Sequence, residues 1–119
     1  MNTVRRIYVE KREPYAVRAK EFKQELEKFL GIDGVKSVRV LYRYTIENIS
    51  EDAYRDALAT IFMDSPVEIL HEETFEHKAE DKIFSVEYLP GQFDQRADSA
   101  EKCIKLFNEN EDPIIRCAT

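Results

Sequence analysis

The sequence predicts an α+β fold, in which an antiparallel sheet carries its helices on one face. Apolar and polar residues alternate over residues 38–46, as they do in a half-buried strand. Other stretches repeat apolar residues every three to four positions, which is typical of amphipathic helices. The order is strand, helix, strand or strand pair, helix, strand, and this order indicates a ferredoxin-like α+β unit.

The first strand is expected at residues 4–10, which are rich in β-branched side chains. Pro14 suits the first turn of the following helix, where a backbone N–H has no partner in any case. The apolar stripe of this helix comprises Tyr15, Ala19, Phe22, Leu26 and Phe29. Gly31 is placed to end the helix, because glycine adopts the left-handed conformation of a helix C-terminus easily.

Residues 38–46 form either one long strand or a tight pair of strands, since no glycine or Asn-Gly marks a turn. Ser50 is expected to cap a second helix, and Asp64-Ser65-Pro66 to stop it. The apolar face of this helix comprises Ala53, Ala57, Leu58, Ile61 and Phe62. The next strand is expected at residues 67–70, with Phe75 as its farthest limit.

Beyond a polar linker at residues 76–81 the pattern starts again. A strand is expected at residues 83–89, a turn at Pro90-Gly91, and a helix capped by Asp94. The stripe of this helix comprises Phe93, Ala97, Ala100, Ile104 and Phe107. Each member lies 78 positions after its counterpart in the first stripe, so we infer an internal duplication.

The duplication divides the chain into two parts. Residues 1–76 form the first α+β unit, and residues 77–119 contain the linker with the first strand and helix of a second unit. Residues 113–119 predict the entry to one more strand, after which the sequence stops. We therefore expect a truncated second unit and a domain fragment that self-associates to cover its unpaired sheet edges.

Composition excludes several classes of function. A net charge of −6 and a pI near 5.0 argue against a nucleic-acid partner. No apolar region follows the N-terminal basic pair, and no apolar run is long enough to cross a membrane, so we expect a cytoplasmic protein. With only three glycines, the chain cannot contain the glycine-rich loops that bind nucleotide phosphates.

The candidate reactive residues have simpler explanations. His71 and His77 lack metal-binding spacing and are expected to be solvated, so no metal site is predicted. Cys103 has no recognisable base to activate it and is expected to pack as a thiol. Tyr42 and Tyr44 beside basic residues suggest an RNA platform, but they share a face with Val38 and Val40, which favours the core.

Residues 88–100, YLPGQFDQRADSA, are the most unusual segment. Pro-Gly sets a tight turn, and small alanines in the helix that follows would allow another surface to pack closely. From the residues alone we expect a turn followed by a capped helix. Our hypothesis is that the segment also forms an interface, with the candidate residues Pro90, Gly91, Gln92, Asp94, Gln95, Arg96 and Asp98.

The same segment carries a family resemblance. FSVEYLPGQFDQRADSAEKCI, with VRRIYVEK, VRVLYRYTIENIS and EDPIIRCAT, resembles the N-terminal region of the large single-chain formylglycinamidine ribonucleotide (FGAM) synthases. These ligases use ATP and glutamine in purine biosynthesis. Their N-terminal region resembles two copies of the small PurS subunit, in agreement with the duplication.

The resemblance implies a non-catalytic structural domain, without catalytic residues or a cofactor of its own. ATP and Mg would bind in later domains of the enzyme, where the glutaminase triad also lies. The partners would be the synthetase and glutaminase domains of the same enzyme. Two alternatives stay open: a stand-alone small-metabolite-binding regulatory module of ferredoxin-like fold, and a small enzyme that uses Cys103.

Overall fold

The computed structural model of the chain describes residues 4–119. In chain order its elements are β1 (Arg5–Lys11), the 3-10 helix η1 (Glu13–Tyr15), α1 (Val17–Lys28), β2 (Leu41–Glu47), α2 (Glu51–Thr60), β3 (Glu68–Glu72), α3 (Gln95–Phe107) and β4 (Ile114–Ala118). None of the helices in this part of the chain is long and apolar enough to cross a membrane.

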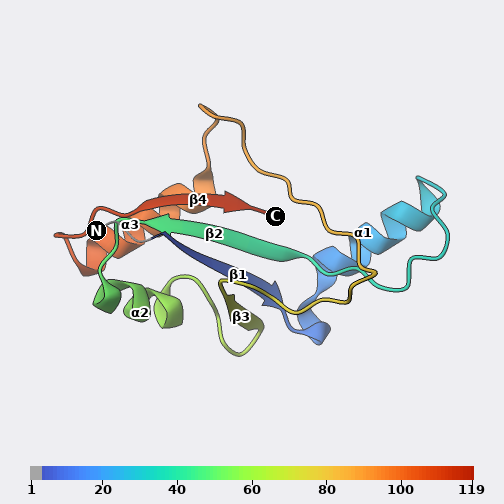
Figure 1. The fold of residues 1–119 in the computed structure, drawn as a ribbon, viewed down its shortest axis with the longest axis horizontal. Coiled ribbons are helices and arrows are strands. Elements are labelled where there is room, and N and C mark those ends of the chain that lie inside the picture. The colour runs from blue at the N-terminus through green and yellow to red at the C-terminus, as the bar shows by residue number, and fades with distance from the viewer. Residues whose placement is uncertain (1–3) are drawn as a thin grey trace.

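The strands form one antiparallel sheet in the order β3-β1-β2-β4 (Figure 1). Both β2 and β3 run antiparallel to β1, so they run parallel to each other with β1 between them. Helix α2 joins these two parallel strands, which makes β2-α2-β3 a split βαβ unit. The predicted α+β class with an antiparallel sheet is therefore confirmed.

The hydrophobic core lies between one face of the sheet and helices α2 and α3. Alternation along β1 turns Ile7 and Val9 to this face, where they are 0% and 2% exposed. The other buried members of the core are Ile46, Tyr54, Ala57, Phe62, Ala97, Ala100, Ile104, Ile115 and Cys117. Two alanines of α3 belong to this set, because small side chains allow the helix to lie close to the sheet. In Figure 1 the strands lie in front and α3 lies behind β4.

The predicted first helix forms as α1, but Pro14, expected in its first turn, lies in the separate 3-10 helix η1, and α1 contributes no residue to this core. It begins beside one end of the sheet and extends away from it (Figure 1). Within its expected stripe Ala19 is buried, whereas Tyr15 is 50% exposed and Phe29 is 81% exposed. Helices α2 and α3 cover the sheet, so α1 lies outside this core, and Phe22 and Leu26 in its stripe are only half-buried.

The second half of the chain departs from its predicted form. Residues 83–89, expected as a strand, make one isolated bridge, Glu87 with Ala118, so that prediction is wrong over most of its length. The predicted strand at residues 113–119 is confirmed as β4, and it pairs with β2. Residues of both predicted units thus share one sheet and one core.

The expected long strand is shorter than its alternation suggests. Strand β2 begins at Leu41 and is a single strand, and β3 ends at Glu72, before Phe75. Both predicted N-caps are confirmed. Ser50 Oγ accepts the Ala53 N–H at 3.2 Å, and Asp94 Oδ1 accepts the Ala97 N–H at 3.0 Å.

Candidate interface at residues 83–98

The segment of residues 83–93 carries a run of large apolar side chains on the surface. Phe84 is 71% exposed, Leu89 is 68% exposed, and Phe93 is 68% exposed. Ile83, Val86 and Tyr88 are also exposed. The end of this segment protrudes beyond β4 and α3, at the top of Figure 1. Exposed apolar side chains gathered in one segment mark an interaction site in many proteins.

A tight turn at Pro90 and Gly91 forms the tip of the protrusion. The Gln92 N–H donates to the Leu89 carbonyl oxygen at 3.0 Å, and Gln92 Oε1 accepts the Leu89 N–H at 2.7 Å. Gly91 has a φ of 89°, which other residues rarely adopt. The backbone geometry at this tip is therefore fixed locally, although its side chains are exposed.

Asp94 anchors the segment to the sheet. One carboxylate oxygen caps α3, and the other accepts the N–H of Cys117 in β4 at 3.1 Å. The sequence predicts only the first of these two roles. The helix start and the outer edge of β4 are thereby held together by one side chain.

The other predicted interface residues differ in their surroundings. The Arg96 guanidinium lies 3.8 Å from the centre of the Tyr42 ring, and Asp98 forms an ion pair with Lys102 at 2.9 Å. Pro90, Gly91, Gln92 and Gln95 remain exposed. The structure therefore gives Gln92, Asp94, Arg96 and Asp98 side-chain contacts within the chain, and leaves Pro90, Gly91 and Gln95 exposed for contact with another surface.

The segment is also attached at its middle. Val86 forms two backbone hydrogen bonds with Thr119, of 2.8 and 2.9 Å, and Glu87 forms an ion pair with Arg43 at 3.0 Å. Further back, the rings of Phe84 and Phe22 lie 6.3 Å apart. Sequence reasoning missed the exposed apolar surface because it assigned residues 83–89 to a paired strand.

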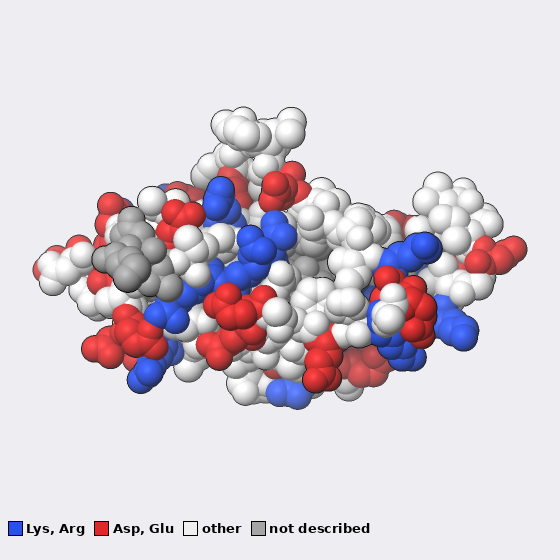
Figure 2. Space-filling model, in the orientation of Figure 1, with Lys and Arg blue, Asp and Glu red and all other residues white. Residues whose placement is uncertain are grey.

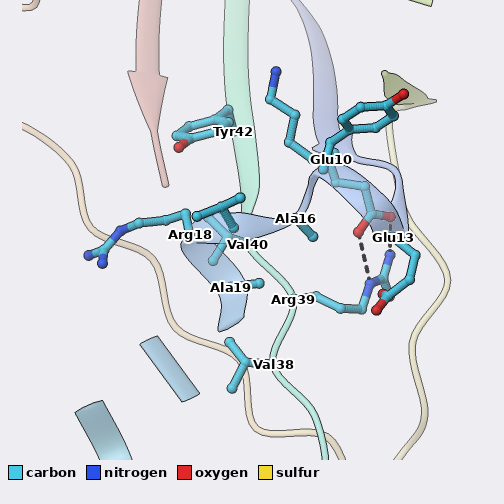
Figure 3. Close-up of a pocket in the computed structure, with 12 residues that line it drawn as sticks. Glu10, Glu13, Ala16, Arg18, Ala19, Val38, Arg39, Val40 and Tyr42 are labelled. Carbon is cyan, nitrogen blue, oxygen red and sulfur yellow. Dashed lines mark hydrogen bonds and ion pairs between the residues drawn. The ribbon is translucent and has the colours of Figure 1, made fainter. Parts of the chain in front are cut away.

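A second feature is a groove of about 230 Å³ between the start of α1 and the ends of β1 and β2. Figure 3 shows Ala16, Ala19, Val38 and Val40 along this groove. Tyr42 lies at one end of it, and Glu10 with Arg39 at the other. The groove thus combines an apolar lining with a charged end.

Glu10 is the centre of a polar cluster at that end. Its carboxylate accepts hydrogen bonds from Arg39 at 2.5 and 3.1 Å, and its Oε1 lies 2.7 Å from His71 Nε2. Burial alone would raise the pKa of Glu10, but the hydrogen bonds from Arg39 and His71 outweigh it and lower the pKa. Glu10 therefore stays ionised and holds β1, β3 and the chain before β2 together.

The face of the sheet opposite the core carries charges of both signs. Figure 2 shows Lys and Arg side chains gathered in a band across this face, with Asp and Glu beside them. The register places Arg6, Thr45 and Arg116 in one row, and Arg116 pairs with Glu47 at 3.2 Å. The core position of Tyr44 and this mixture of charges give no support to an RNA platform.

His71, expected to be solvated, is half-buried and its Nε2 lies 2.7 Å from Glu10 Oε1, so that expectation is wrong. Cys117 is buried, and burial raises its pKa to about 12, so its thiol is protonated near neutral pH. Cys103 is a half-buried free thiol. Within residues 4–119, no three His, Cys, Asp or Glu side chains come together as metal ligands.

Comparison with protein-family models, with curated proteins and with solved structures returns no match.

Proposed function

We propose that this chain is a non-catalytic assembly domain of FGAM synthase, the ATP- and glutamine-dependent ligase that converts FGAR to FGAM. The observation that supports it is the apolar surface of residues 83–93, where six large apolar side chains are exposed. This surface lies in the segment whose sequence resembles the synthase family, and buried apolar area is the main driving force of domain association.

The domain would be PurS-like, with a ferredoxin-like arrangement of its first part. The split βαβ unit of β2, α2 and β3 supports this assignment, because ferredoxin-like folds are built from such units. In this proposal residues 83–93 contact the synthetase and glutaminase domains in the cytoplasm, help to position them, and shield the ammonia route between them. ATP, Mg and the catalytic residues belong to those other domains.

Two substitutions in the full-length synthase test the role of the apolar surface. Leu89→Lys places a charge in it, and Leu106→Lys is the matched control on α3, where the leucine is 85% exposed. We expect Leu89→Lys to lower glutamine-dependent turnover more than ammonia-dependent turnover, because a misplaced glutaminase loses ammonia to solvent. Equal losses of both activities, or an equal effect of the control, would contradict the proposal.

The predicted contacts of Arg96 and Asp98 provide a second comparison. Replacing both with alanine should also lower glutamine-dependent turnover more than ammonia-dependent turnover. Because Arg96 contacts Tyr42 within the chain, the thermal stability of this variant is measured alongside its turnover. Loss of stability without selective loss of glutamine-dependent turnover would assign Arg96 to folding alone.

The mass of the native polypeptide is an independent test. An immunoblot of source-cell lysate should show a band far heavier than the 14.0 kDa of this chain. A band at 14.0 kDa would replace the proposal with a free PurS-like subunit or a regulatory module.

The groove beside α1 favours a second candidate, a regulatory module that binds a small metabolite. Its apolar lining with Glu10 and Arg39 at one end suits a small ligand that has both apolar and charged parts. A thermal-shift screen with amino acids and nucleotides tests this candidate, because a ligand that binds only the folded state raises Tm. No shift with either class would reject it.

A further inference from the structure

One edge of the 83–88 segment is bonded to the sheet and the other is free. Val86 directs both its N–H and its C=O to Thr119. Successive residues of an extended strand direct these groups to opposite sides. Ser85 and Glu87 therefore direct their backbone groups away from β4, and within residues 4–119 those groups form no hydrogen bond.

The side chains of this segment also suit a strand that lacks its neighbour. Phe84, Val86 and Tyr88 alternate with Ser85 and Glu87, so the three apolar side chains share one face. They are 71%, 62% and 55% exposed. The charge of Glu87 is compensated by Arg43. A strand that paired with residues 83–88 would contact apolar side chains and no unpaired charge.

The outer edge of β4 shows the opposite arrangement. Its outward N–H groups at Ile115 and Cys117 donate to Glu101 of α3 and to Asp94, the N-cap residue of α3. Only beyond Cys117 does the edge open, and there Thr119 bonds to Val86. Because the outer N–H groups of β4 are occupied, a further strand on this side of the sheet can be added only at residues 83–88, which lie next to the end of β4.

We propose that residues 83–88 receive an extended segment from the remainder of the synthase, which adds a strand to the sheet. This inference rests on the proposed function and names the kind of partner. The added strand bonds to the backbone of Ser85 and Glu87 and places apolar side chains beside Phe84, Val86 and Tyr88. Because residues 83–88 lie next to β4, the added strand would lie on their far side, and the absence of an unpaired charge on this edge favours an apolar strand.

Amide hydrogen exchange of Ser85 and Glu87 tests this proposal directly. We expect fast exchange in the 119-residue chain and exchange slower by roughly two orders of magnitude in the full-length synthase. The Val86 N–H, which bonds to Thr119, is the internal reference in both. Equally fast exchange of Ser85 and Glu87 in chain and synthase would overturn the inference.

Proline substitution provides a second measurement. Ser85→Pro removes the outward N–H while leaving the Val86 bonds in place, and Ser85→Ala is the matched control that keeps the N–H. We expect Ser85→Pro, but not Ser85→Ala, to lower the Tm of the synthase, and neither to change the Tm of the chain alone. Equal effects in the synthase would overturn the inference.

Two further outcomes separate this inference from the proposed function. If the full-length synthase dimerises and Ser85→Pro abolishes that dimer, the occupant is a second copy and the inference is overturned. If the immunoblot shows a polypeptide of 14.0 kDa, the proposed function fails and the inference fails with it. A heavy polypeptide with fast exchange at Ser85 and Glu87 overturns the inference alone.

Discussion

The carboxylate of Asp94 accepts a hydrogen bond from the backbone N–H of Cys117 at 3.1 Å. One turn further along α3 from the capped Ala97, Glu101 accepts the N–H of Ile115 at 2.9 Å. Both donors belong to the outer edge of β4, and the acceptors are the N-cap residue of α3 and a residue within α3. Acidic side chains thus occupy strand groups that would otherwise be available to pair with another chain.

Replacing Asp94 with alanine should destabilise the fold by about 2–4 kcal/mol. The change removes a helix cap, which contributes about 1 kcal/mol, and leaves the Cys117 N–H without a partner, which costs about 1–3 kcal/mol. Urea unfolding measures the loss. Asp98→Ala, which breaks the ion pair of the half-buried Asp98 with the exposed Lys102, should cost less than about 1 kcal/mol. Similar losses for the two variants would show that the Asp94 bonds contribute little.

Glu101→Ala should loosen β4 at one position. The Ile115 N–H loses its acceptor, so its hydrogen exchange should accelerate, while Arg116, opposite Thr45 in the β2 ladder, should remain protected. Glu101→Gln keeps a carbonyl oxygen at the same place and should restore most of the protection. Unchanged exchange at Ile115 in the alanine variant would argue that the side chain does not shield this edge.

Stability should fall at alkaline pH through Tyr44. Burial raises its pKa from 10.0 to about 12, so the folded state holds the phenol proton more tightly than the unfolded state. The contribution is complete below pH 10 and is lost as the pH rises towards about 12. The free energy of unfolding, measured across this window, should depend less on pH in Tyr44→Phe. Identical slopes for the two proteins would assign the loss to other groups.

Stability should also fall at acid pH through Glu10. Its folded-state pKa is lower than the ordinary value of 4.5, because hydrogen bonds from Arg39 and His71 outweigh the effect of burial. The contribution is therefore present above pH 4.5 and is lost as the pH falls through the folded-state pKa. Glu10→Gln should be less stable than the wild type at neutral pH and lose less stability on acidification. A parallel decline in both proteins would contradict this assignment.

The features that sequence reasoning located correctly depend on residues that are close together in the sequence. Ser50 and Asp94 cap helices because each side chain reaches an N–H three residues later. The position of helix α1 could also be predicted, because it depends on the spacing of apolar residues within one segment. The strand predicted at residues 83–89 failed because a strand exists only when another strand pairs with it, and the pattern of one segment does not specify that partner.

The features of the candidate interface also differ in whether they depend on neighbouring or on distant residues. The turn at Pro90-Gly91 and the cap at Asp94 could be predicted, because their geometry is local. The contact of Arg96 with Tyr42 and the bond from Cys117 to Asp94 could not, since they join residues that are distant in sequence. Within the predicted α3 stripe, Phe93 and Phe107 proved exposed for a similar reason, because the sheet reaches only its central residues.

The sequence by itself determined the α+β class, the positions of the helices and their caps, because these depend on propensity and on hydrogen bonds within a few residues. Only the tertiary structure decided that β4 pairs with β2, that α1 stays outside the core, and that residues 83–93 remain exposed. Those outcomes depend on which apolar surfaces meet. Burial against a distant segment is a property of the whole chain and not of any local pattern.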